Sequence, residues 1–123
     1  MGMQVYCNNR ALWAPSLQVG TLFLNQIRAL EPIVGLESGI ENPLADMLEI
    51  EASAFATFIQ RLLHLLDTTN NGPLFALAAG CTEVALVLHA DITEQWPVVS
   101  DRLKSLLHKA QTVMSALPER QVR

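Results

Sequence analysis

Four stretches of the chain either place apolar residues at the three- and four-residue spacing of an amphipathic helix or are apolar throughout. We expect helices over residues 17–30, 53–67, 73–90 and 98–117. The third of these has no polar face, a pattern typical of a central helix that neighbouring helices or a second subunit cover. The pattern therefore predicts a mainly α fold.

The segments between these helices predict strands and loops. Residues 3–7 and 47–51 alternate between apolar and polar side chains and could pair as a short two-stranded β-ribbon. Residues 11–16 and 35–43 are expected to be loops, because they combine proline, glycine and polar residues. Ser16 is placed to cap the first helix, which Pro32 and Gly35 should end.

Length and composition support one compact four-helix domain, which we place at residues 1–117, followed by a frayed tail at 118–123. A hydrophobic fraction of 50% excludes a disordered chain. Charged residues make up only 16%, which leaves little polar cover for the surface. This favours self-association as a homodimer, or a protein partner.

The charge is acidic overall and unevenly distributed. The formal net charge of −4 argues against a nucleic-acid partner, which normally requires clustered Lys and Arg. Six carboxylates lie between Arg28 and Arg61 with no base among them, whereas basic residues prevail from Asp101 onward. The plain interpretation is a solvated loop and an ordinary helix end. The alternative is an acidic face and a basic tail that meet across a dimer or bind a partner.

The two cysteines and the apolar segments bear on location. Cys7 and Cys81 lack metal-ligand spacing and are expected to be free thiols in a reducing compartment. No signal peptide is visible, and the apolar stretch at 73–88 is interrupted by Glu83 and is short for a membrane span. We therefore expect a cytoplasmic protein with no membrane partner.

Two parts of the chain resemble a known family. Residues 11–16 (ALWAPS), followed by residues 21–24, are similar to the opening of DUF6086, a group of small actinobacterial proteins of unknown function. Residues 35–40 and 55–63 resemble its middle portion, and the likeness covers about residues 3–90. Ala14 stands where this family usually has Asn. The resemblance implies a bacterial setting and supplies no catalytic residues.

Four residues are candidates for a ligand site. Glu83 is the only charged residue in an otherwise apolar helix, so burial would raise its pKa, although a strip of small residues could instead carry it to the surface. His89 ends that helix, where a histidine is also favoured by the helix dipole. Trp13 and Trp96 could line a pocket or simply anchor the core.

Recognised catalytic and cofactor motifs are missing from the sequence, so no cofactor and no metal are expected. His89 and Asp91 alone are too few for a mononuclear metal site. Two hypotheses remain open. The first is a helical interaction protein that acts through a protein partner without catalysis. The second is a small-molecule binder or cofactor-independent enzyme of bacterial specialised metabolism, with its pocket between the helices. Whether the protein is an enzyme is uncertain from the sequence.

Overall fold

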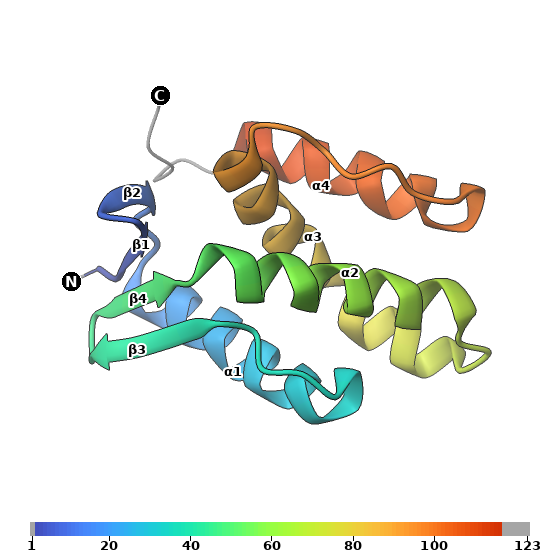
Figure 1. The fold of residues 1–123 in the computed structure, drawn as a ribbon, viewed down its shortest axis with the longest axis horizontal. Helices are drawn as coiled ribbons and strands as arrows, with labels where there is room; N and C mark the ends of the chain where they lie inside the picture. Colours follow the sequence, from blue (N-terminus) through green and yellow to red (C-terminus); the bar gives the residue numbers. More distant parts are fainter. Residues whose placement is uncertain (1, 117–123) are drawn as a thin grey trace.

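The computed structural model describes residues 2–116 and shows, over this range, four α-helices and a four-stranded sheet (Figure 1). In chain order the elements are β1 (Gln4–Cys7), β2 (Arg10–Trp13), α1 (Leu17–Val34), β3 (Ile40–Leu44), β4 (Met47–Ile50), α2 (Ala52–Thr68), α3 (Gly72–Thr93), a 3-10 turn (Asp101–Leu103) and α4 (Lys104–Ala116). The mainly α fold is confirmed. The tail predicted at 118–123 lies outside the described residues.

The sheet is larger than the expected two-stranded ribbon. The two predicted segments do pair, in parallel, with Val5 opposite Leu48. However, β2 and β3 extend the sheet on either side, in the order β2-β1-β4-β3, through two antiparallel pairings. The expectation of loops at residues 11–16 and 35–43 is therefore wrong where these two strands lie.

Local chemistry explains both missed strands. Asn8 and Asn9 both have positive φ (51° and 64°), the conformation that a tight two-residue hairpin turn requires. In β3 the side chains from Glu41 onward are exposed, so the strand shows no apolar alternation. Pro43 is tolerated there because β3 lies at the sheet edge, where a missing backbone N–H costs little.

Side-chain caps begin α1, α2 and α3, and three expected bounds need correction, including that of α3, which continues to Thr93 and does not end at residue 90. The Ser16 hydroxyl accepts a hydrogen bond from Val19 N at 3.2 Å, as predicted. The helix α1 continues through Pro32 and ends at Gly35, whose φ of 86° and N–H bond to Glu31 O close the last turn. The fourth helix begins at Lys104, not at residue 98, because residues 98–100 have no regular secondary structure and residues 101–103 form the 3-10 turn.

The core lies between the sheet and the helices, and α3 crosses the middle of the molecule between α4 and α1 (Figure 1). The expected inner face of α2 is buried: Phe55, Phe58, Ile59, Leu62 and Leu66. In α3 burial is uneven along the helix. Residues 85–88 are buried, whereas Pro73, Ala76, Leu77 and Gly80 are exposed. The second half of this apolar helix is thus more completely covered than the first.

Within the described residues, α3 is the one helix whose length and composition would suffice to cross a membrane. Core helices share these features, so the match is weak evidence for a membrane span.

Candidate functional site

The four candidate residues separate into two groups. Trp13 is 3% exposed in β2 and packs edge-on against Phe23, with ring centres 6.1 Å apart, so it is a core residue. Glu83 is half-buried on α3, where burial raises its pKa and the charge of Lys109 opposes that rise. His89 and Trp96 both line one surface cleft, whereas Trp13 and Glu83 do not line it.

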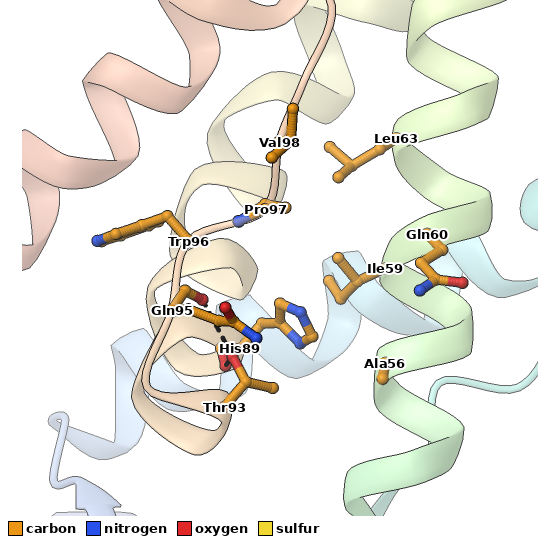
Figure 2. A pocket seen from close by; sticks show the side chains of 10 residues that line it. All are labelled: Ala56, Ile59, Gln60, Leu63, His89, Thr93, Gln95, Trp96, Pro97 and Val98. Atoms are coloured by element: carbon orange, nitrogen blue, oxygen red, sulfur yellow. Dashed lines mark hydrogen bonds between the residues drawn. The ribbon is translucent and has the colours of Figure 1, made fainter.

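This cleft lies between α2, the last turns of α3 and the connection that follows α3 (Figure 2). Its volume is about 590 Å³. The apolar lining comes from Ala56, Ile59, Leu63, Trp96, Pro97 and Val98, and the polar lining from Gln60, His89, Thr93 and Gln95. Its size falls within the range of about 300–1,000 Å³ that is typical of small-molecule sites.

The end of α3 positions residues 95–98, which form the third wall of the cleft. Glu94 adopts a left-handed conformation (φ 63°), and its N–H donates to Ala90 O at 2.7 Å, which ends the helix. The Thr93 hydroxyl lies 2.9 Å from His89 O and 3.0 Å from Gln95 O. This hydroxyl therefore joins the last helical turn to the connection and directs residues 95–98 back over α2.

Figure 2 shows how the side chains point. The His89 ring lies between α3 and α2 and faces Ile59, and the Gln95 carboxamide lies beside it. Gln60 projects from α2 on the opposite wall. The Trp96 indole is directed away from these groups and packs against the core. Trp96 thus helps to fix the connection, and it does not present its ring face to the cleft.

The electrostatics of the cleft are neutral. Burial lowers the pKa of His89, so the imidazole is uncharged at neutral pH and can both donate and accept a hydrogen bond. Its ring also contacts Phe55 edge-on at 6.3 Å. None of the ten lining residues is Asp, Glu, Lys or Arg. Within residues 2–116 no carboxylate or hydroxyl hydrogen-bonds to the imidazole.

The possible metal ligands do not come together. Asp91 is buried, and its carbonyl accepts a hydrogen bond from Arg10 Nη2 at 2.8 Å. Within the part of the chain that the structure describes, no group of three or more His, Cys, Asp or Glu side chains could hold a metal ion.

A second surface feature lies between α1 and α3. Here Gln26, Ala29, Leu30 and Ile33 of α1 face Leu74, Leu77, Ala78 and Cys81 of α3 across an apolar groove of about 310 Å³. Leu77 is 82% exposed and Ile33 is 51% exposed. Leu22, which is 58% exposed, lies on the same side of α1 as Gln26, Ala29 and Ile33 by helical spacing. We call this surface the α1–α3 face.

Part of the acidic segment has a structural role. Glu31 Oε2 accepts hydrogen bonds from Ser38 N and Oγ at 2.9 and 2.7 Å and pairs with Arg28 at 2.8 Å. Glu51 caps α2 by accepting a hydrogen bond from Ala54 N at 2.6 Å. Two of the six carboxylates therefore stabilise a helix start and the turn that follows α1.

Gln60, Thr93 and Gln95 are the polar cleft residues that the sequence analysis did not single out. A glutamine on the polar side of a helix, or in a connection, normally faces solvent and carries no signal of its own. The sequence offered only indirect evidence for the two glutamines: Gln60 lies on α2, another face of which is buried, and Gln95 follows shortly after α3. The α1–α3 face was signalled more clearly, by a helix with no polar side.

Comparison with known proteins identifies one family. The family model described as "Family of unknown function (DUF6086)" matches residues 1–119, nearly the whole chain. No curated protein and no solved structure matches the chain.

Proposed function

The chain belongs to the DUF6086 family, and because the function of that family is unknown, we propose from this chain's own surface that it is a small helical interaction protein without catalytic activity. It self-associates through the α1–α3 face and acts through a protein partner. We also propose a bacterial, cytoplasmic setting; the free, buried cysteines Cys7 and Cys81 support the cytoplasmic part of this proposal.

One observation carries the proposal: an apolar side chain stands almost fully in solvent beside an apolar groove. Leu77 is 82% exposed, and the groove next to it is lined chiefly by aliphatic side chains. Exposed apolar surface of this kind is costly in water, and contiguous patches of it typically mark protein–protein contact sites.

The favoured occupant is a second copy of the chain. A two-fold dimer apposes the same surface on both subunits, so a face with a net charge would repel itself. The α1–α3 face carries no charge, because Leu22, Gln26, Ala29 and Ile33 are neutral and residues 72–82 of α3 include no Asp, Glu, Lys or Arg. The same face holds a protruding Leu77 and a groove, so two copies can each insert this side chain into the other's groove.

The backbone also permits close approach. Gly80 lies one turn after Leu77, and a Cβ added there would meet no other atom within 4 Å. A helix from a second copy can therefore approach α3 at this position without displacing existing side chains.

Sedimentation velocity over a range of protein concentrations tests the proposal. We expect a dimer for the wild type and a monomer for Leu77→Glu, because the substitution places two carboxylates in the apolar contact. Leu44→Glu is the matched control, since Leu44 is 61% exposed on β3, away from the face, and should leave the dimer intact. A wild-type monomer at all concentrations, or equal loss of the dimer in both variants, would overturn the proposal.

A further inference from the structure

We propose that the cleft between α2, the end of α3 and residues 95–98 binds an uncharged small molecule that combines an amide-type hydrogen-bonding edge with an apolar ring. This site is separate from the α1–α3 face, so the inference goes beyond the proposed function and does not depend on it.

Polar side chains from three segments of the chain converge on the cleft. Gln60 comes from α2, His89 from α3 and Gln95 from the connection, and all three line the same cleft (Figure 2). Within residues 2–116 none of these side chains has a hydrogen-bond partner. Their donors and acceptors therefore remain available to a ligand.

The chemistry of these groups selects the ligand's polar edge. A carboxamide presents a donor and an acceptor side by side, and a neutral imidazole presents one of each. The best complement is a group that itself offers an adjacent donor and acceptor, which is the pattern of a carboxamide or a lactam. A carboxylate or an ammonium group would leave either the donors or the acceptors of the cleft unpaired.

The uncharged lining of the cleft disfavours ionic ligands. The lining contains no Asp, Glu, Lys or Arg to neutralise a bound ion, and a half-buried charge without a partner is unfavourable. The ring of His89 is kept neutral by its own burial, so it supplies no positive charge for an anion at neutral pH.

The aliphatic side chains of the cleft explain why we expect the ligand to carry an apolar ring. Leu63 on α2 faces Val98 across the opening, and the buried Ile59 lies nearer to His89 (Figure 2). A flat ring placed between Leu63 and Val98 would exclude water from these two side chains while its amide edge reaches the glutamines and the imidazole.

Protein-observed NMR with three neutral probes, nicotinamide, benzamide and 2-pyridone, tests the inference. We expect millimolar concentrations to shift the side-chain NH₂ signals of Gln60 and Gln95 and the backbone signals of residues 89–96. Nicotinate and benzoate, which share the rings of two probes but are anionic, should bind at least about tenfold more weakly, the effect of roughly one lost hydrogen bond.

Substitutions of glutamine by glutamate test whether the probes bind in the cleft. Gln60→Glu and Gln95→Glu should each weaken nicotinamide binding by about tenfold, because each replaces the NH₂ donor by a charged acceptor. Gln18→Glu, the same change at an exposed position of α1, should have no effect. Far-UV circular dichroism verifies that each variant is folded.

Three outcomes would overturn the inference: no shift in the cleft with any neutral probe, equal binding of the amides and the carboxylates, or equal weakening in all three glutamine variants. The oligomeric state is measured in the same samples. Loss of dimerisation with intact probe binding would count against the proposed function alone.

Discussion

At the scale of single residues, a network around Glu31 decides how α1 connects to the sheet. Glu31 binds Ser38 through two hydrogen bonds and pairs with Arg28, which also donates to Ile40 O at the start of β3. Burial by itself would raise the pKa of Glu31, but the Ser38 hydrogen bonds and the Arg28 charge together lower it. The carboxylate form is therefore favoured by folding.

Glu31→Gln should destabilise the fold by about 1–2 kcal/mol at neutral pH, because the charge-assisted hydrogen bonds become weaker neutral ones. A lowered folded-state pKa means that the contribution is fully present above the unfolded pKa and is lost as the pH falls through the folded value. The difference between wild type and variant should thus shrink below about pH 4.5. Urea denaturation at several pH values measures it.

Glu37→Gln provides the comparison, because Glu37 is an exposed carboxylate in the same segment. It should change stability by less than about 0.5 kcal/mol. If the two variants behaved alike at neutral pH, the Glu31 network would contribute nothing specific.

At the scale of elements, the segment between α1 and β3 docks closely on the start of α2. Gly39 has a φ of 78°, and a Cβ added there would lie 2.8 Å from Ala54 Cβ and 3.1 Å from Glu51 O. Glu51 N also donates to Gly39 O at 2.8 Å. The segment is therefore held by backbone contacts that leave no room for a side chain.

Gly39→Ala should lower the free energy of unfolding by about 2–4 kcal/mol, because it combines a strained φ with overlap against Ala54 Cβ and close approach to backbone atoms of α2. Gly35→Ala separates the two causes, since Gly35 also has a positive φ (86°) but a Cβ there would meet nothing within 4 Å. This variant should lose only about 1 kcal/mol. Equal losses in thermal or urea unfolding would show that the close approach at Gly39 is unimportant.

Elements that bury one face could be predicted from the sequence, whereas elements at the edge of the sheet could not. Apolar spacing identified α2 because Phe55, Phe58 and Leu62 must all face the core. In β3 the register depends on pairing with β4, and side chains such as Glu41 point into solvent. The hydrophobic pattern of the sequence therefore does not predict this strand.

At the scale of the whole molecule, the cleft was only partly accessible to sequence reasoning. The structure brings His89 and Trp96 to one cleft, but it turns the indole away and adds Gln60 and Gln95. Those two glutamines line the same cleft because the chain turns at the left-handed residue Glu94 and brings the connection back over α2. That reversal comes from tertiary packing, which a single sequence does not encode in any local pattern.

The proposed self-association through the α1–α3 face would have a consequence for the stability of the whole chain. If the dimer forms only from folded subunits, mass action stabilises the fold more as the protein concentration rises. The wild-type melting temperature should therefore increase with concentration. Leu77→Glu should melt at a temperature that does not depend on concentration, because Leu77 is 82% exposed in the single subunit and contributes little to its core.

The two melting curves should converge when the wild type is diluted until it dissociates. Convergence distinguishes a lost interface from a damaged fold, because core damage would lower the melting temperature by the same amount at every concentration. Calorimetry or dye-free fluorescence melting at increasing concentrations provides the measurement. A wild-type melting temperature that stays constant while the variant melts lower throughout would place Leu77 in the monomer's own stability and remove the α1–α3 face as an interface.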